Sequence, residues 1–145
     1  MKYTVINFHS YVEFATYKPQ DVEKPIKANY FDKGILKIVR FIQDTYDLDN
    51  PYKIYYCADG IQINSKCFIS ESMEKIVKYN RYSSTGKPHT VTNYYNWQGE
   101  PHNENGPAYL IQDLDGNIKK EEYILFGITL TEKEWQDKIS AKLYW

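Results

Sequence analysis

The sequence has few cysteines, no long apolar run and no excess of charge. Only Cys57 and Cys67 occur among its 145 residues, so we expect no disulfide scaffold and take the reducing cytoplasm as the compartment. No segment approaches the roughly 20 apolar residues that a membrane-spanning helix needs, and we expect no membrane partner. Residues 1–14 contain neither a long apolar core nor a small-residue cleavage site, so we expect no secretory signal peptide.

The charges nearly cancel, with 18 Lys and Arg against 19 Asp and Glu. Such a chain has no global field that would attract nucleic acid or an anionic membrane. The sequence also lacks a Gly-rich loop followed by Lys and Ser or Thr, which phosphate-binding loops require. It contains no recognisable catalytic constellation. We therefore expect a non-enzymatic protein without a cofactor or a metal ion.

Aromatic residues are abundant: tyrosine occurs 15 times, and Phe, Trp and Tyr make up 17% of the chain. This composition is typical of sheets whose tyrosine rings pack while their hydroxyl groups stay in water. We expect a single domain of mainly β (α+β) class over residues 1–145. It would comprise an N-terminal portion at 1–50, a twisted antiparallel β-meander of serial hairpins at 51–130, and a C-terminal helix at 131–145.

The stretch 94–135 carries the clearest alternation of strands and turns. Its short runs of Tyr, Ile, Leu and Phe suit half-buried strands. Four glycines mark the turns, where residues that tolerate positive φ are wanted. They are Gly99, Gly106, Gly116 and Gly127.

A helix is predicted over 132–142. Thr131 and Glu134 have the spacing of a capping box, in which a hydroxyl and a carboxylate satisfy backbone N–H groups at the start of a helix. Three large apolar residues then recur every four positions: Trp135, Ile139 and Leu143. This stripe predicts that the helix packs on the sheet.

Residues 51–70 form the clearest hairpin, with Asp59-Gly60 as a two-residue turn. The cross-strand pairs would be Tyr56 with Ile63, Ile54 with Ser65, Tyr52 with Cys67, and Cys57 with Gln62. One face is then mostly apolar and the other mostly polar, which specifies the register. On this register Cys57 and Cys67 lie on opposite faces, so we expect both to be free thiols.

The remaining segments are less regular. Residues 2–8 and 11–17 are both rich in β-forming residues, and the proline-containing segment 18–28 is expected to be an exposed loop. The segment 34–47 spaces its charges as on one face of a helix, although its β-branched and aromatic residues favour a strand. We interpret it as a helix, with a strand as the alternative. Residues 71–80 suit either a short helix or a strand.

A basic segment at 75–89 suggests one possible function. It contains four cations and a tyrosine that lies between them: Lys75, Lys78, Arg81, Tyr82 and Lys87. Cations interleaved with aromatic rings are typical of a surface that binds single-stranded nucleic acid. The same residues suit a solvated strand whose charges oppose aggregation. We favour the solvated strand, because four charges without a motif are weak evidence for nucleic acid.

Two histidines hold equivalent places in two local matches, TGKPH and QGEPH, which end at His89 and His102. Glu100 and Glu104 flank His102, and these residue types suit a metal site or an acid–base pair. No metal-ligand spacing supports such a site. We therefore interpret each histidine as a turn residue that is hydrogen-bonded to the backbone.

The segment GEPHNENGPA at 99–108 is followed by a turn at 115–116 and by YILFG at 123–127. This order resembles the MORN-like repeat of small bacteriophage and giant-virus proteins. That repeat runs Gly-Lys-x-His-Arg-x-Asp-Gly-Pro-Ala, then a turn, then aromatic-x-x-x-Gly. Its ending, a Gly followed by Thr-Glu-x-Glu and an aromatic residue, is similar to 127–135 here.

The resemblance is best over 94–135, and it departs from the repeat at Asn103, where Arg is usual, and at Asn105, where Asp is usual. It implies a β-meander. By analogy it also implies a non-enzymatic protein-binding module of a phage or mobile element that inhibits a host protein. The sharpest form of this hypothesis is an anti-defence inhibitor, such as an anti-CRISPR protein, in the host cytoplasm.

For such a module, we expect partner contacts at Tyr94, Tyr95 and Trp97, because Tyr and Trp dominate interface hot spots. Strand alternation would place Tyr95 and Trp97 on one face and Tyr94 on the other. One set would then remain exposed as an apolar patch. The acidic strand residues Glu121 and Glu122 are the next candidates. The alternative partner is single-stranded nucleic acid at the basic segment.

Overall fold

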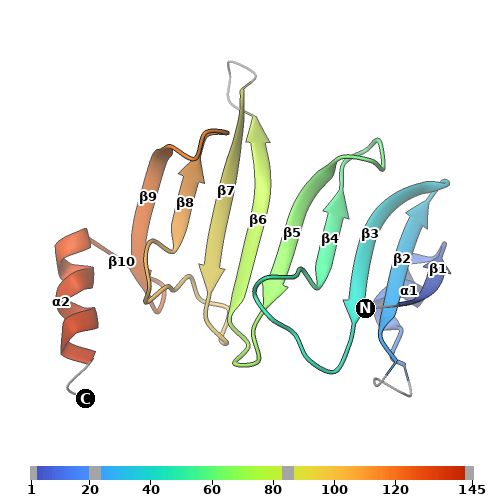
Figure 1. Ribbon diagram of the computed structural model, residues 1–145, viewed down its shortest axis with the longest axis horizontal. Coiled ribbons are helices and arrows are strands. Elements are labelled where there is room, and N and C mark those ends of the chain that lie inside the picture. Colours follow the sequence, from blue (N-terminus) through green and yellow to red (C-terminus); the bar gives the residue numbers. More distant parts are fainter. Residues whose placement is uncertain (1–2, 20–23, 83–86, 143–145) are drawn as a thin grey trace. The chain divides into compact units, whose positions relative to one another are not determined.

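The computed structural model describes residues 3–19, 24–82 and 87–142 (Figure 1). Over these residues the chain forms ten strands and two helices. The predicted mainly β meander of hairpins with a C-terminal helix is confirmed. Contacts gather the chain into two compact units, Met1–Glu71 and Ser72–Trp145.

The first unit contains five strands and a short helix. Its elements are β1 (Thr4–Phe8), α1 (Tyr11–Thr16), β2 (Ile26–Asp32), β3 (Ile35–Ile42), β4 (Lys53–Tyr56) and β5 (Ile63–Ile69). β1 lies parallel to β2, and β2 to β5 pair antiparallel in chain order. α1 packs on β1 and β2 and buries Phe14 against Ile26, Ala28 and Ile38, which form the core of this unit.

The prediction of a helix over 34–47 is wrong, because residues 35–42 are strand β3. β3 pairs with β2 on one side and with β4 on the other. Two adjacent residues of β3, Ile38 and Val39, are both buried, at 9% and 1% exposure. Successive strand residues point to opposite faces, so β3 buries an apolar side chain on each face of the sheet. The β-branched residues, rather than the charge spacing, were the correct signal.

The β-prone segment 11–17 is also corrected, since residues 11–16 are helix α1. Ser10 caps this helix: its hydroxyl accepts a hydrogen bond from the backbone N–H of Glu13 at 3.4 Å. A Ser followed three residues later by Glu is a local start signal for a helix. The expected strand over 2–8 is confirmed as β1. The loop expected over 18–28 is shorter than predicted, because strand β2 begins at Ile26. Residues 20–23 of that loop lie outside the described residues.

The hairpin of β4 and β5 is confirmed, but its turn is longer than predicted. Tyr56 pairs with Ile63 as expected. The N–H of Cys57 donates to the carbonyl of Gln62 at 2.8 Å, and the N–H of Gly60 donates to the carbonyl of Cys57 at 3.0 Å. A four-residue loop at 58–61 therefore replaces the two-residue turn.

A bulge beyond Tyr56 shifts the rest of this register by one residue, so that Lys53 pairs with Cys67. Cys67 therefore lies on the same face as Lys53, and strand alternation places Cys57, four residues after Lys53, on that face too. The prediction that the two cysteines lie on opposite faces is wrong. Neither Cys57 nor Cys67 is joined in a disulfide, as expected. Cys57 lies opposite Gln62 and Cys67 opposite Lys53. About four residues, or roughly 13 Å of strand, separate them, which is beyond the reach of a disulfide.

The second unit is an antiparallel meander followed by a helix. Its elements are β6 (Lys75–Tyr82), β7 (Pro88–Tyr95), β8 (Tyr109–Gln112), β9 (Ile118–Leu125), β10 (Ile128–Leu130) and α2 (Glu132–Lys142). Successive strands pair antiparallel from β6 to β10. The segment 71–80 therefore enters a strand. Val91 and Ala108 are fully buried in this unit.

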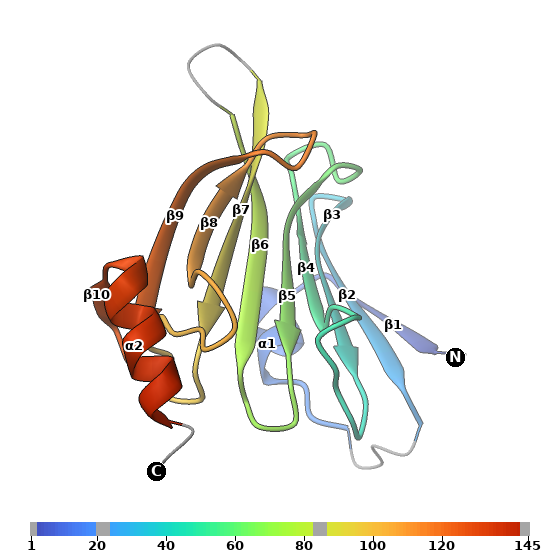
Figure 2. The same cartoon turned by 60° about the vertical axis from the view of Figure 1, so that its left-hand side comes forward.

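α2 has the predicted bounds and the predicted cap. The N–H of Glu134 donates to the Thr131 hydroxyl at 3.1 Å, and the Glu134 carboxylate accepts from the Thr131 N–H at 3.3 Å. The ring of Trp135 packs on Tyr123 with centroids 5.1 Å apart, and its Nε1–H donates to the carbonyl of Asn103 at 2.9 Å. Figure 2 shows α2 lying along β9 and β10. The third stripe residue, Leu143, lies outside the described residues.

The predicted turn glycines behave in two ways. Gly99, Gly116 and Gly127 have positive φ, as expected. Gly106 does not, so its expected role is corrected. The bend around it is held instead by Asn103, whose side chain accepts from the N–H of Asn105 at 3.0 Å and donates to the carbonyl of Pro107 at 3.0 Å.

Candidate functional site

Trp97 lies on a turn and not on a strand face. β7 ends at Tyr95, so alternation does not extend to Trp97, and the prediction that these two residues share a face is wrong. Trp97 is 70% exposed. Tyr94 and Tyr95 are half-buried, and their pairing with Ile76 and Lys75 keeps them on opposite faces of the sheet.

The turn that carries Trp97 is held by the buried side chain of Asn96. The side-chain carbonyl of Asn96 accepts two hydrogen bonds, from the backbone N–H of Gln98 at 3.1 Å and from that of Glu100 at 2.9 Å. Its amide donates to the Glu100 carboxylate at 3.1 Å. Two backbone bonds, from Gly99 N–H to Asn96 C=O and from Asn96 N–H to Glu100 C=O, close the loop. The turn therefore presents Trp97 from a fixed backbone.

The same turn geometry recurs between β8 and β9. Asp113 accepts from the N–H of Asp115 at 3.0 Å and of Asn117 at 2.9 Å, and the N–H of Gly116 donates to the Asp113 carbonyl at 3.1 Å. The residue that corresponds to Trp97 is Leu114, which is 76% exposed. This position is thus exposed by the turn itself. Leu114 lies at the opposite end of the strands from Trp97, because β7 and β8 are antiparallel.

The turn between β9 and β10 carries a second exposed aromatic residue. Phe126 and Gly127 both have positive φ, of 51° and 79°, which is the geometry of a type I′ hairpin turn. Asn, Asp or Gly is usual at the first position, and a bulky residue there is strained. The turn between β2 and β3 has the same geometry with Lys33 and Gly34. Phe126 is 54% exposed.

His102 connects the two turns. Its Nδ1 accepts a hydrogen bond from the N–H of Phe126 at 3.0 Å, and its ring lies 4.4 Å from the Phe126 ring. The N–H of Gly127 donates to the carbonyl of Pro101 at 2.9 Å. The interpretation of His102 as a residue bonded to backbone is confirmed. Residues far apart in sequence therefore build one end of the sheet.

We call the exposed side chains at this end of the sheet the apolar tip, which consists of Trp97, Phe126 and Ile128. Their exposed fractions are 70%, 54% and 63%. Sequence reasoning found Trp97 and missed the other two. The signal that could have found Phe126 is the pair Phe126-Gly127 between two β-forming runs, which is a two-residue turn with an apolar residue at its tip.

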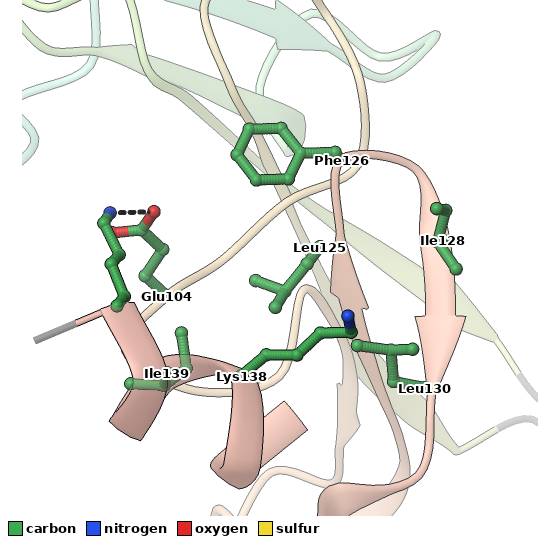
Figure 3. A pocket seen from close by; sticks show the side chains of 8 residues that line it. Glu104, Leu125, Phe126, Ile128, Leu130, Lys138 and Ile139 are labelled. Atoms are coloured by element: carbon green, nitrogen blue, oxygen red, sulfur yellow. Dashed lines mark hydrogen bonds and ion pairs between the residues drawn. The ribbon is translucent and has the colours of Figure 1, made fainter. Parts of the chain in front are cut away.

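Between α2 and the strands β9 and β10 lies a cavity of about 170 Å³ (Figure 3). Its walls come from β9, β10, the turn between them, α2 and the loop between β7 and β8: Glu104, Leu125, Phe126, Ile128, Leu130, Lys138, Ile139 and Lys142. Glu104 forms an ion pair with Lys142 and lies 3.4 Å from Nε2 of His102. The hydrogen bond from Lys142, more than the nearby charges, holds the pKa of the Glu104 carboxyl below its usual value of 4.5.

The predicted acidic pair is divided between the two faces of β9. Glu121 pairs with Leu110 and Glu122 with Tyr109. Following these pairs into β7 places Glu122 on the face of Tyr95 and Glu121 on the face of Tyr94. Glu122 lies 3.7 Å from Lys120 in an exposed ion pair. The five predicted partner-binding residues therefore do not form one surface.

The predicted nucleic-acid residues are divided in the same way. Lys75 and Arg81 occupy alternate positions of β6 that pair with Tyr95 and His89, whereas Lys78 and Tyr82 occupy the positions between them. Lys87 precedes β7. Strand alternation thus sends Lys75 and Lys78 to opposite faces of β6 rather than to one strip. Their role in nucleic-acid binding stays a prediction.

No group of three or more His, Cys, Asp and Glu side chains is placed to hold a metal ion within 3–19, 24–82 and 87–142. No helix in this part of the chain is long and apolar enough to span a membrane.

A second hollow, of about 330 Å³, lies in the first unit against Tyr17, Arg40, Tyr46 and Tyr52. The Arg40 guanidinium donates to the carbonyl of Tyr17 at 2.9 Å and lies 5.3 Å from the centre of the Phe14 ring. This cation therefore stabilises the end of α1.

No protein-family model, no curated protein sequence and no solved structure matches this chain. The resemblance to MORN-like repeats therefore rests on the residues from Gly99 to Trp135 alone.

Proposed function

We propose that this protein is a non-enzymatic protein-binding module whose main anchor is Trp97. The observation that carries the proposal is the exposure of this large ring, 70%, on a turn whose backbone is held by the buried Asn96. A ring on a fixed turn loses little conformational freedom on binding, so more of its contact energy contributes to affinity.

Phe126 and Ile128 support the proposal because they add two exposed apolar side chains at the end of the sheet that carries Trp97. Phe126 occupies a strained backbone position where the equivalent residue of the first unit is Lys33. Strain of this kind costs on the order of 1–3 kcal/mol and is found more often at functional sites than elsewhere. Asn or Gly would fit this turn with less strain, so the presence of an aromatic ring there supports a role for the ring in binding.

The MORN-like resemblance extends the proposal to origin and role. It favours an accessory protein of a phage or mobile element that acts in the host cytoplasm and inhibits a host protein, for example as an anti-CRISPR-like anti-defence factor. The support for this finer statement is the repeat motif at 99–108 and 123–127.

Affinity purification with matched baits tests the proposal. The tagged wild-type chain, Trp97→Ala and Leu114→Ala would be used in parallel with an extract of the cells in which the protein occurs. Leu114 is the control, because it has the same turn position and a similar exposure at the other end of the sheet. We expect one stoichiometric protein partner with the wild type and with Leu114→Ala, and its loss with Trp97→Ala.

The salt dependence of capture separates the two classes of partner. Binding through an apolar tip should change little between low and moderate salt, whereas phosphate contacts make affinity fall steeply. Recovery of nucleic acid that is lost with salt and with Lys75→Ala, but not with Trp97→Ala, would contradict the proposal and support the alternative at 75–89.

A further inference from the structure

The cavity between α2 and the strands β9 and β10 is large enough for a small apolar group. A cavity of about 150 Å³ lined by Leu, Ile and Phe stays dry and binds benzene, and this cavity measures about 170 Å³. Figure 3 shows Leu125 and Ile139 facing each other across its centre, with Leu130 at the β10 side. The interior therefore offers contacts to an aliphatic or phenyl group and few polar partners.

The rim of the cavity carries one uncompensated cation. Lys142 is paired with Glu104, so these two charges offset each other. Glu134, one helical turn before Lys138, is occupied by the N–H of Thr131. Among the described residues, Lys138 makes no ion pair, and Figure 3 shows its side chain extended across the cavity toward Leu130.

We propose that this cavity binds a small carboxylate with an apolar part of about the size of a phenyl ring. The apolar part lies between Leu125, Leu130 and Ile139, and the carboxylate pairs with Nζ of Lys138. A carboxylate is favoured over a neutral or cationic group because the rim has a net positive charge, from two lysines and one glutamate. The proposal does not depend on the protein-binding role of Trp97.

The probe for this site is 3-phenylpropionate, followed by chemical-shift changes of backbone amides in ¹H–¹⁵N spectra. A ligand of this size should bind with a dissociation constant on the order of 1 mM. We expect the largest shifts at Leu125, Leu130 and Ile139. Two related probes separate the contributions: 3-phenylpropanol has the ring without the charge, and acetate has the charge without the ring. Both should bind about tenfold more weakly or not at all.

Three variants locate the site. Lys138→Gln should weaken 3-phenylpropionate about tenfold while leaving 3-phenylpropanol unchanged. Lys133→Gln, on the same helix but outside the cavity lining, is the matched control and should bind like the wild type. Ile128→Trp should block the opening, because Ile128 is an exposed lining residue whose replacement leaves the core intact.

The melting temperature of each variant would be measured first, so that loss of binding is not confused with unfolding. Unchanged spectra at about 20 mM 3-phenylpropionate would overturn the proposal, since saturation is expected there. Shifts confined to other parts of the chain, or equal binding by Lys138→Gln and the wild type, would also overturn it. Trp97→Ala should bind the probe normally, so the two proposals can fail separately.

Discussion

Nδ1 of His102 accepts a hydrogen bond from the backbone N–H of Phe126 at 3.0 Å, across 24 positions of sequence. An accepting Nδ1 carries no proton, which places the proton of the neutral ring on Nε2, toward Glu104 at 3.4 Å. Glu104 in turn pairs with Lys142 near the end of α2. One histidine thus connects the strained β9–β10 turn to the C-terminal helix.

Replacing His102 by Ala should destabilise the fold. The substitution removes a ring contact and leaves the N–H of Phe126 without its partner, which we expect to lower the free energy of unfolding by about 1–3 kcal/mol. His89→Ala is the control, because the hydrogen bond described for the His89 side chain is a local one, with the carbonyl of Lys87, and its loss should change stability by less than about 0.5 kcal/mol. Urea unfolding followed by tryptophan fluorescence measures both. Equal effects would contradict the role given to His102.

The Glu104–Lys142 pair should make stability depend on pH. The pKa of Glu104 is lowered in the folded state, first by the hydrogen bond from Lys142. The folded protein therefore holds the ionised form more tightly, and this stabilisation is present above the unfolded pKa of about 4.5 and is lost as the pH falls through the folded pKa.

The variant Glu104→Gln tests this. Its deficit in unfolding free energy relative to the wild type should be largest near neutral pH and should shrink below about pH 4. Lys142→Gln breaks the same pair from the other side, so the double variant should cost less than the sum of the two single variants. A deficit that stays constant with pH would show that packing rather than charge is responsible.

Asn96→Asp should destabilise the Trp97 turn in a pH-dependent way. Asp retains the acceptors for Gln98 and Glu100 N–H groups, as Asp113 does in its own turn. It replaces the amide that now donates to the Glu100 carboxylate at 3.1 Å by a second carboxylate. The two charges repel, so the loss of stability should be greater at pH 7 than at about pH 4. Adding Glu100→Gln should restore most of it, and failure to do so would exclude repulsion.

Alanine substitutions should show that Tyr94 and Tyr95 stabilise the fold, whereas Trp97 does not. Tyr94→Ala and Tyr95→Ala remove half-buried rings and should lower the free energy of unfolding by about 1–3 kcal/mol each. Trp97→Ala removes an exposed ring and should change it by less than about 0.5 kcal/mol. Thermal unfolding followed by circular dichroism compares them. A large loss with Trp97→Ala would mean that the ring is structural, and the anchor would have to be sought elsewhere.

Phe126→Asn should preserve stability while weakening partner binding. Asn suits the first position of a type I′ turn, and relief of backbone strain offsets the lost contact with His102, so we expect a net change within about 1 kcal/mol. Loss of a hot-spot ring lowers affinity about thirtyfold. Lys33→Asn in the equivalent turn is the control for binding. The partner is the protein captured by the wild-type chain and lost with Trp97→Ala. If Phe126→Asn binds it with unchanged affinity, Phe126 is not part of the interface.

The local signals in the sequence were sufficient for much of the second unit. Thr131 and Glu134 predicted the start of α2, and three of the four glycines predicted positive φ. Capping boxes and left-handed turns are decided by residues within a few positions of one another, so sequence reasoning reaches them. The same reasoning predicted the β4–β5 hairpin but not its bulge, because bulges depend on how a strand fits its neighbours.

Tertiary structure decided the elements and contacts that local signals leave open. Residues 35–42 are a strand because β2 and β4 pair with both edges and apolar groups are buried on both faces. The contact of His102 with Phe126 and the cavity between α2 and the strands β9 and β10 join segments that only the folded meander brings together. The sequence by itself therefore determined the turns and caps, whose free energy is local. The tip and the cavity arose from packing, which depends on neighbours distant in the chain.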